Sequence, residues 1–535
     1  MPRCLKGARH GISHVVRLAG IAFFVLRGTL ALDMPPRPPS TLATEAIIAM
    51  AAKYSEGLPG YVDASTLPRQ IDPSTSASPL NSSVAVLLTG STGHLGSDIL
   101  EILLKDARVE RIFTFDREGK GAAPRARQRA RWADKGLDEQ LLESPKLVVL
   151  CGDLSAPKFG LDKEVYDEMR TKVTIIIHAA WSVNRIRPLA AFEPSVRGLR
   201  ALVDFARSAS QDVRILFTST FYSARSWPGT ALMTPEDSAT AASAPPDSDC
   251  ASPDSDCASP TSTVLVPEAL SRTSTPGILG RAPVPESLIN NPGVCIGGGG
   301  YAQSKYVAER VLAASGLQFA SVRIGQLSGS AASATWKGRA ASASTQKRAA
   351  SALTQSRGAS ATTQRRAAWA TSSWLPILFE TSVTLGALPD GAEQMVPWLP
   401  IDTAARALVD IALSACPLSP SYNMVHPRPI SWSQMMRYFQ RSLAHVPGKE
   451  LPLVSFEEWI ARLETVACSM TVNAQRGAPG IALLPAFRDI SGAFSQTFAM
   501  DKALAVSPTL REAAPMSQAD VDGWSRLSQT SSHSA

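Results

Sequence analysis

The sequence has few of the residues that mark secreted or metal-binding proteins. Its 535 residues include only seven cysteines, an odd number, and no two of them have the spacing of a zinc or redox motif. Apart from His10 and His14, which are four residues apart near the start of the chain, no histidine lies at metal-ligand spacing from a cysteine or from another histidine. We therefore expect no metal site, and we expect a reducing compartment, the cytoplasm.

The sequence also lacks a long hydrophobic run. The one apolar segment that could touch a membrane, Leu18 to Leu26, is too short to cross a bilayer, which takes about 20 apolar residues. It follows a basic stretch, as a signal-peptide core would, but Arg27 interrupts it and the residues around Asp33 form a poor cleavage site. We expect no stable membrane span and interpret residues 1–40 as a leader and linker.

The sequence shows no periodic cluster of positive charge that would form a basic face. The 53 Lys and Arg against 46 Asp and Glu give a formal net charge of +7. Much of the positive charge lies in low-complexity stretches, so we expect no nucleic-acid partner. A modest positive net charge is also compatible with an acidic protein partner or a phosphorylated ligand. The 44% of hydrophobic residues excludes a fully disordered chain.

The order of apolar runs predicts the fold. After a short helix and linker at residues 41–83, six apolar runs alternate with amphipathic segments up to about residue 330. This pattern predicts a doubly wound α/β domain, a parallel sheet with helices on both faces. The expected strands are Val84–Leu88, Arg111–Phe115, Leu147–Leu150, Val173–Ile177, Val213–Phe217 and Phe319–Ile324.

Two low-complexity stretches interrupt the pattern. Residues 229–281 are rich in Ser, Ala and Pro and contain a duplicated heptad, and residues 337–368 repeat a Thr-Gln pair. Because neither has enough apolar surface to offset chain entropy, we predict two disordered surface insertions. From about Trp374, residues 374–525 have mixed helix signals and predict a smaller α-rich, substrate-binding unit above the ends of the strands.

A glycine-rich loop follows the first predicted strand directly and precedes its helix. The glycines allow a tight turn, close approach to a pyrophosphate, and close packing of helix on strand. An ordinary glycine-rich turn is the alternative, but the strand–turn–helix context favours dinucleotide binding. The residues expected to bind the cofactor here are Gly90, Ser91, Thr92, Gly93, His94, Leu95 and Gly96.

The end of the second predicted strand indicates which dinucleotide binds. Asp116 there is typical of NAD sites, where an acid accepts the ribose hydroxyls, whereas Arg117 is typical of a contact to the 2′-phosphate of NADP. Three further arginines follow, namely Arg125, Arg127 and Arg129. Their bidentate donors favour NADP over NAD, and a solvated basic helix is the alternative. Asp153, after the third strand, could bind the adenine amino group.

A second motif places Tyr301 and Lys305 on one face of a predicted helix. The lysine ammonium can stabilise the phenolate and hold the nicotinamide ribose, which brings the tyrosine, with an ordinary pKa of about 10, toward acid–base work. The strand that ends at Thr220 supplies hydroxyls that could polarise a carbonyl group. A Tyr-x-x-x-Lys pattern is common by chance, but together with the glycine loop it is specific.

These motifs resemble the extended short-chain dehydrogenase/reductase superfamily. Within it, the sequence looks like the thioester reductase domains of carboxylic acid reductases, aminoadipate reductases and fungal enzymes related to non-ribosomal peptide synthetases. The likeness spans about Thr41 to Trp524, apart from the two low-complexity stretches. It is carried by collinear segments at Gly136–Asp138, Ser144–Lys146, Val173–Trp181, Phe192–Pro194, Arg323–Gly329, Trp398–Asp402 and His426–Pro429.

The resemblance implies an NADPH site and a catalytic set. NADPH would lie on Thr89–Gly96, with Arg117 and Arg127 on the 2′-phosphate. The remaining cofactor contacts would be Asp153 and Leu154 at the adenine, and Ala179, Ala180 and Trp181 beside the cofactor. The catalytic set would be Thr220, Tyr301 and Lys305.

The resemblance also implies the substrate, an acyl thioester on the phosphopantetheine arm of a carrier domain, released as an aldehyde and possibly reduced on to an alcohol. Multidomain members carry adenylation and carrier domains upstream, for which the residues before Thr41 leave no room. We therefore expect a separate carrier or an acyl-CoA as partner, or a fragment of a larger gene. Alternatives are an epimerase or dehydrogenase acting on a nucleotide sugar or sterol, and a non-catalytic remnant.

Overall fold

The computed structural model describes most of the region from residue 41 to residue 530. The expected leader at 1–40, the linker from residue 61, and the two low-complexity stretches at 229–281 and 337–368 lie outside the described residues. The described ranges are 41–60, 84–119, 121–184, 187–228, 282–330, 374–391, 394–444, 451–468, 479–484, 487–488 and 496–530.

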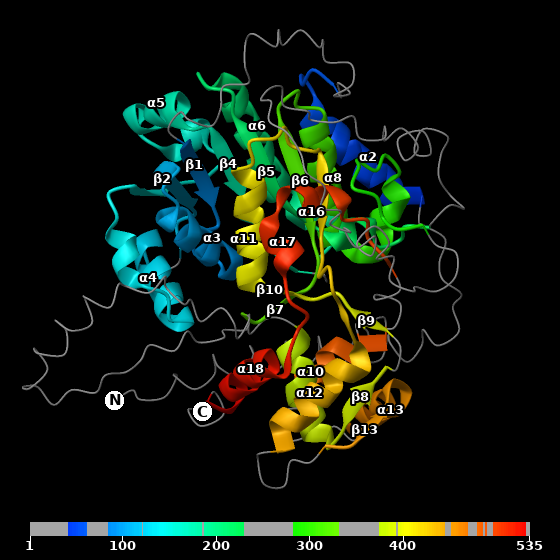
Figure 1. The fold of residues 1–535 in the computed structure, drawn as a ribbon. Coiled ribbons are helices and arrows are strands. Elements are labelled where there is room, and N and C mark those ends of the chain that lie inside the picture. The colour runs from blue at the N-terminus through cyan, green and yellow to red at the C-terminus, as the bar shows by residue number, and fades with distance from the viewer. Residues whose placement is uncertain are drawn as a thin grey trace, which may run out of the picture.

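A seven-stranded parallel sheet forms the centre of the larger lobe (Figure 1). Its strand order is β11-β6-β5-β4-β1-β2-β3, so the order reverses between β1 and β4, where doubly wound sheets bind their ligands. All six predicted strands are present, and β11 is an addition. The strands are β1 Val84–Thr89, β2 Val109–Asp116, β3 Leu147–Cys151, β4 Ile175–His178, β5 Arg214–Thr220, β6 Phe319–Ile324 and β11 Ser421–Met424.

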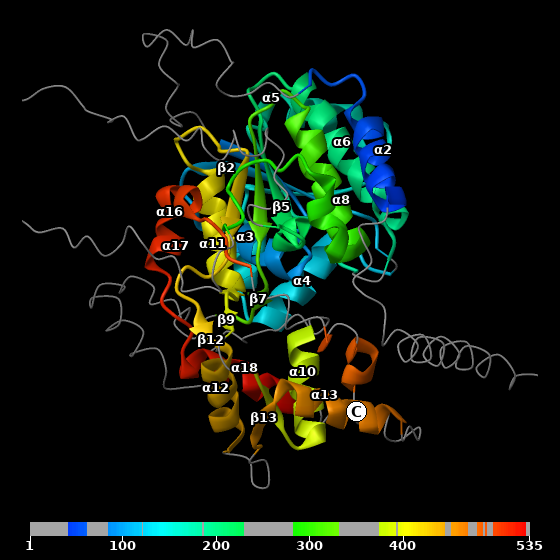
Figure 2. The ribbon, with the colours of Figure 1, turned by 90° about the vertical axis from the view of Figure 1, so that its right-hand side faces the viewer.

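Helices cover both faces of the sheet, as the apolar pattern predicts. On one face, α3 (His94–Lys105) and α11 (Ile401–Ala412) pack on β1, β4 and β6 in one core. On the other face, α5 (Lys163–Lys172), α6 (Glu193–Ser208) and α8 (Gly299–Ala313) pack on β2, β4 and β5. Helix α4 (Pro124–Lys135) buries Trp132 beside α3, and α2 (Thr41–Ser55) lies outside α8 (Figure 2).

The smaller lobe lies below the sheet in Figure 1 and has its own core. Four buried tryptophans, joined by phenylalanines, fill it: Trp398, Trp432, Trp459 and Trp524. Its helices are α10 Trp374–Leu385, α12 Trp432–Ala444, α13 Phe456–Cys468 and α18 Gln518–Thr530. Short strands pair β8 (Leu388–Asp390) with β13 (Leu453–Ser455) and β9 (Met395–Val396) with β12 (Ile430–Ser431).

The boundary between the lobes differs from the expectation of one unit over residues 374–525. Helix α11 packs on α3, and β11 pairs with β6, so residues 401–424 belong to the layers of the larger sheet. The short helices α16 (Asp501–Val506) and α17 (Pro508–Glu512) lie against α11 (Figure 1). The chain leaves the sheet after β6 through β7 (Leu327–Ser328) and returns through β10 (Leu399–Pro400), which pairs with it. The smaller lobe is therefore assembled from separate segments.

Tryptophan side chains hold the chain on either side of the two longest gaps between described residues after β1, which are 229–281 and 331–373. Nε1 of Trp227 donates to the carbonyl oxygen of Ala282 at 3.2 Å, which joins the two ends of the first interruption. At the second, Nε1 of Trp524 donates to the carbonyl oxygen of Ser330 at 3.0 Å, and Trp374 donates to Gln326 at 2.8 Å. The scaffold is thus fixed on both sides of each interruption.

A buried carboxylate holds the segment that follows the first interruption. Glu286 accepts hydrogen bonds from the backbone N–H groups of Asn423 at 3.1 Å, Lys502 at 2.6 Å and Ala503 at 3.0 Å. It therefore joins this segment to β11 and to the start of α16. Burial raises the pKa of Glu286 from its ordinary 4.5 to about 7.

This raised pKa predicts pH-dependent stability. Because the folded protein binds the proton more tightly than the unfolded chain, the stabilisation is fully present below about pH 4.5 and is lost as the pH rises through about 7. The loss is about 3 kcal/mol in the free energy of unfolding. We expect Glu286→Gln to remove this part of the pH dependence, measured by urea unfolding at about pH 5 and about pH 8. A variant with the wild-type pH dependence would contradict the assignment.

Candidate active site

The glycine loop between β1 and α3 has the geometry of a phosphate-binding turn. Gly90 has a φ of +81°, and a Cβ at this position would lie 2.8 Å from the backbone nitrogen of Ala180. A Cβ on Gly96 would lie 2.1 Å from the carbonyl oxygen of Gly90. Only glycine fits at either position. The turn thereby brings the N-terminus of α3 close to β1 and β4, where the helix dipole favours an anion.

Asp116 supports this loop through both of its carboxylate oxygens. The hydroxyl of Ser91 donates to Oδ2 at 2.5 Å, and the hydroxyl of Thr92 donates to Oδ1 at 3.2 Å. Gln128 on α4 donates to Ser91 Oγ at 2.7 Å. The buried carboxylate therefore faces the loop, and its two oxygens already accept from the protein.

The arginines expected near the 2′-phosphate divide into two groups. Arg125 and Arg129 both pair with Glu143, away from the loop, at 3.0 and 2.7 Å. Arg117 is exposed at the end of β2, and Arg127 donates to the carbonyl oxygen of Arg117. The buried Nε of Arg127 has no hydrogen-bond partner among the described residues, which leaves a donor for an anionic ligand at this corner.

Arg131 is a residue that sequence reasoning missed. Its Nε lies 3.5 Å from the carbonyl oxygen of Thr92, and its Nη1 lies 3.1 Å from Nε2 of His94. Burial, assisted by the nearby Arg131 charge, lowers the pKa of His94 to about 4, so the imidazole is neutral and accepts this bond. Arg131 follows Arg127 by four residues on α4, and this helical spacing was the available signal.

The other expected cofactor contacts lie at the ends of neighbouring strands. Asp153 is exposed after β3, where its Oδ1 accepts the N–H of Ser155 at 2.8 Å, and Leu154 lies against Gly198 of α6. Ala180 follows β4, and its N–H donates to Thr89 Oγ1 at 3.2 Å. These residues border the carboxyl edge of β1, β3 and β4.

Lys305 lies in an aromatic enclosure. Its ammonium nitrogen is 4.4 Å from the ring centroids of Trp181 and Phe217, and 5.9 Å from that of Tyr301. It donates to the carbonyl oxygen of Thr218, two residues before the end of β5. Burial lowers the pKa of Lys305 well below its ordinary value. The motif lysine is therefore fixed against β5, and cation–π contacts replace part of its hydration.

Tyr301 and Thr220 lie on the two elements that meet at this enclosure. Tyr301 is in the first turn of α8, with its ring centroid 6.2 Å from that of Phe192. Thr220 ends β5 and begins the 3₁₀ helix η4 (Phe221–Ala224). Helix α8 contacts both β5 and η4. The structure thus brings the three expected catalytic residues to one corner of the sheet, beside the strand that leads to Ala179 and Trp181.

His178 lies between this corner and the glycine loop. Its Nδ1 is 2.7 Å from Thr89 Oγ1, and its ring stacks on Phe217 with centroids 5.8 Å apart. Burial lowers its pKa to about 3, so the ring is neutral. These contacts give His178 a packing role at the end of β4.

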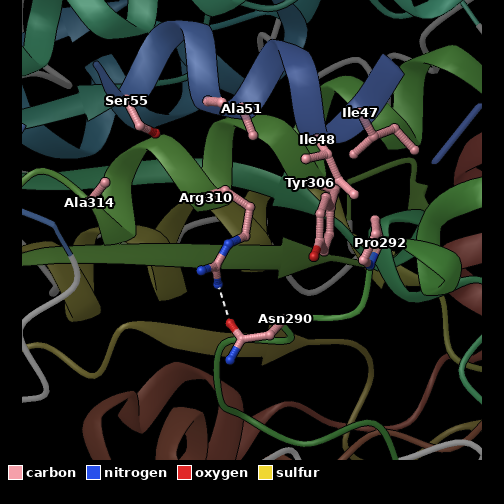
Figure 3. Close-up of a pocket in the computed structure, with 10 residues that line it drawn as sticks. Ile47, Ile48, Ala51, Ser55, Asn290, Pro292, Tyr306, Arg310 and Ala314 are labelled. Atoms are coloured by element: carbon pink, nitrogen blue, oxygen red, sulfur yellow. Dashed lines mark hydrogen bonds between the residues drawn. The ribbon is translucent and has the colours of Figure 1, made fainter. Parts of the chain in front are cut away.

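A pocket of about 290 Å³ lies elsewhere, between α2 and the outer face of α8 (Figure 3). Ile47, Ala51, Tyr306 and Arg310 are among its lining residues. Tyr306 and its neighbours on α8 belong to the core shared with α2, whereas Lys305 faces β5. This pocket is therefore separate from the corner formed by the motif residues.

Within the described ranges, no cluster of three His, Cys, Asp or Glu side chains could hold a metal ion. In the same part of the chain, no helix combines the length and the apolar character that crossing a membrane requires.

Comparison with known proteins shows the family to which the chain belongs. Residues 88–408, more than half of it, match the family model described as Male sterility protein. The adenylate-forming reductase Nps11 of Serpula lacrymans var. lacrymans is 34% identical over 493 residues, which are 88% of this chain and 36% of that protein. Nps9, an adenylate-forming reductase of the same fungus, is 30% identical and covers 84% of this chain and 35% of its own length. The chain thus spans about a third of the length of these relatives.

A solved structure has a similar fold. The terminal R domain from the myxalamid PKS-NRPS biosynthetic pathway has a TM-score of 0.59 at 18% identity, with 92% of this chain and 98% of that chain covered. At this identity the likeness concerns the fold, and it confirms the predicted extended Rossmann architecture. The chain therefore belongs to the Male sterility protein family.

Proposed function

We propose that the chain is an NADPH-dependent reductase that releases an acyl group from a thioester as an aldehyde. The observation that carries this proposal is the position of Tyr301, Lys305 and Thr220 at one corner of the sheet, next to the glycine loop. The similarity to two fungal adenylate-forming reductases supports a substrate derived from a carboxylic acid.

The residues present fit the dinucleotide. The Gly90 turn and the start of α3 would hold the pyrophosphate, and Arg117, Arg127 and Arg131 would supply cations for a 2′-phosphate. Asp116 is occupied by the loop hydroxyls, which argues against a ribose contact typical of NAD. When bound, the nicotinamide would supply a hydride to the thioester carbonyl carbon.

The protein's own residues would act on the carbonyl oxygen. Hydrogen bonds from Thr220 and Tyr301 would stabilise the negative charge that develops there, and Tyr301 would donate its phenolic proton. Lys305, held over the ring faces of Trp181 and Phe217, would favour the phenolate that remains. Loss of the thiol from the resulting hemithioacetal would give the aldehyde.

The substrate partner we propose is an acyl-phosphopantetheine carrier domain, or an acyl-CoA that presents the same arm. The smaller lobe, which faces the sheet through β7 and β10, is the part proposed to bind the acyl group. We place this reaction in the cytoplasm, in agreement with the free cysteines Cys151, Cys295, Cys416 and Cys468.

Thioester-dependent oxidation of NADPH by the purified chain tests this proposal. An acyl-phosphopantetheine thioester should be consumed with formation of aldehyde, whereas the free acid should cause no oxidation. Binding of the dinucleotide without consumption of the thioester would reject the proposal and favour a non-catalytic remnant. Turnover of a nucleotide sugar or sterol instead would favour the epimerase or dehydrogenase alternative.

The cofactor preference gives a separate prediction. We expect Arg117→Gln to raise the Michaelis constant for NADPH by about 10- to 100-fold and to leave that for NADH unchanged, because one charge-assisted bond to the 2′-phosphate is lost. Steady-state kinetics with both dinucleotides measures this effect. Arg129→Gln is the matched control, since Arg129 pairs with Glu143 away from the loop. Equal effects on NADPH and NADH would contradict the 2′-phosphate contact.

A further inference from the structure

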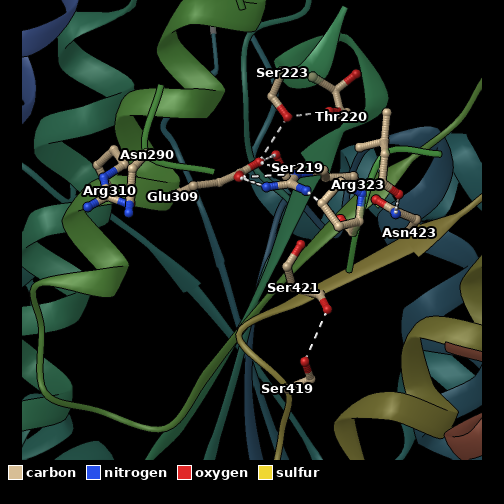
Figure 4. Close-up of polar contacts among 12 residues, drawn as sticks. Ser219, Thr220, Ser223, Asn290, Glu309, Arg310, Arg323, Ser419, Ser421 and Asn423 are labelled. Atoms are coloured by element: carbon tan, nitrogen blue, oxygen red, sulfur yellow. Dashed lines mark hydrogen bonds and ion pairs between the residues drawn. The ribbon is translucent and has the colours of Figure 1, made fainter. Parts of the chain in front are cut away.

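A buried ion pair lies beside the end of β5 (Figure 4). The side chains of Glu309 on α8 and Arg323 on β6 are 2% and 1% exposed, and Nη2 of Arg323 is 2.7 Å from Oε2 of Glu309. Nε of Arg323 lies 3.3 and 3.2 Å from the two carboxylate oxygens. Breaking such a pair would leave a buried charge uncompensated, so its geometry fixes α8 against β6.

Two serine hydroxyls reach the same carboxylate. Oγ of Ser219 is 2.5 Å from Oε1 of Glu309, and Oγ of Ser223 is 3.0 Å from that same oxygen. The two serines lie on either side of Thr220 in the sequence, and Ser223 Oγ is also 2.7 Å from the carbonyl oxygen of Thr220. The segment that carries Thr220 is thus attached to α8 on both sides. We call Glu309, Arg323, Ser219 and Ser223 the Glu309 network.

Helix α8, which carries Glu309, also carries Tyr301 and Lys305, two of the three expected catalytic residues. Tyr301, Lys305 and Glu309 follow one another at intervals of four, so they lie along one stripe of α8. Arg323 extends the attachment, because its Nη1 donates to the carbonyl oxygen of Pro285 at 3.2 Å. The Glu309 network therefore links β5, η4, α8, β6 and the segment that leads back into α8.

We propose that the Glu309 network positions Thr220 relative to Tyr301. This inference rests on the proposed function, because it assumes that both hydroxyls act on one carbonyl oxygen. Oε1 of Glu309 accepts from the two serines beside Thr220, and both carboxylate oxygens contact Arg323. The carboxylate therefore sets the spacing between the end of β5 and α8. The four residues are positioning residues and do not touch the substrate.

The double variant Ser219→Ala/Ser223→Ala tests this role, because it leaves the ion pair in place. We expect kcat to fall by about 10- to 100-fold, since a shift of about 1 Å in catalytic geometry can cost that much. The Michaelis constant for the thioester and the dissociation constant of NADPH should stay within about twofold. Ser315→Ala is the matched control, because its buried hydroxyl donates to Leu312 at the far end of α8, and its kcat should remain unchanged.

Amide hydrogen exchange provides a readout that does not depend on turnover. Residues 219–224 should exchange faster in the double variant than in the wild type, whereas they should be unaffected in Ser315→Ala. Wild-type kcat together with wild-type exchange in the double variant would overturn the inference. If the wild-type chain consumes no thioester, the proposed function fails, and exchange alone then decides whether the network holds the Thr220 segment.

Discussion

Replacement of Tyr301 by phenylalanine should reduce thioester-dependent turnover by about 10²- to 10⁴-fold, the usual contribution of a positioned general acid. The change removes the phenolic hydroxyl and keeps the ring that packs near Phe192. The glycine loop is untouched, so NADPH should bind as in the wild type. Single-turnover measurement of aldehyde formation, with NADPH binding followed by fluorescence, separates the two effects.

Tyr306→Phe is the matched control for this variant. Tyr306 is buried on the same helix but faces α2, so loss of its hydroxyl should leave turnover unchanged. Turnover of Tyr301→Phe at the wild-type rate would exclude Tyr301 as the proton donor. A parallel loss of NADPH binding would instead indicate that the tyrosine mainly holds the cofactor.

Lys135→Met should lower the free energy of unfolding by about 3–5 kcal/mol. Lys135 on α4 forms an ion pair with Asp98 of α3, and each side chain is 1% exposed. Its ammonium also donates to the carbonyl oxygen of His94 at 2.8 Å, at the first residue of α3. In the variant, the carboxylate of Asp98 would remain buried without a positive partner, and this uncompensated charge would lower the stability of the fold.

Urea denaturation measures this loss, and Lys105→Met provides the comparison. Lys105 pairs with Glu101 within α3, where the two side chains are 37% and 11% exposed, so its replacement should cost less than that of the fully buried Lys135. Because His94 begins the helix that follows the glycine loop, NADPH affinity should also fall in Lys135→Met. Similar stabilities of the two variants would show that the buried pair contributes little.

The sequence alone predicts the frame of this fold because its signals are local. Each of the six strands from β1 to β6 contains a cluster of apolar residues, which is the usual pattern of a buried parallel strand. The sequence does not predict β11, because two of its four residues, Ser421 and Asn423, are polar although they are buried, so the strand lacks an apolar run. Its place beside β6 depends on pairing across the sheet, which no local pattern records.

In the candidate site too, features with short spacings are predictable from the sequence, and contacts between distant residues are not. The glycine loop and the Tyr301–Lys305 pair have fixed short spacings, so their patterns are visible in the sequence. The contacts of Asp116 with Ser91 and of Glu309 with Ser219 join residues 25 and 90 positions apart. Such contacts depend on strand register and helix packing, and residue type at one position does not reveal them. The sequence therefore predicts the residues of short motifs better than the distant residues that contact them.

The tryptophan contacts at the two interruptions bear on how this gene could change over time. Trp227 meets Ala282, and Trp374 and Trp524 secure the chain on both sides of the second interruption. Each doubling of the intervening length then adds only about 0.6 kcal/mol of closure entropy. Insertions or deletions at these two points, such as a duplication like that of the heptad, would therefore change the stability of the fold little. These points are where lineages carrying this domain should differ most in length.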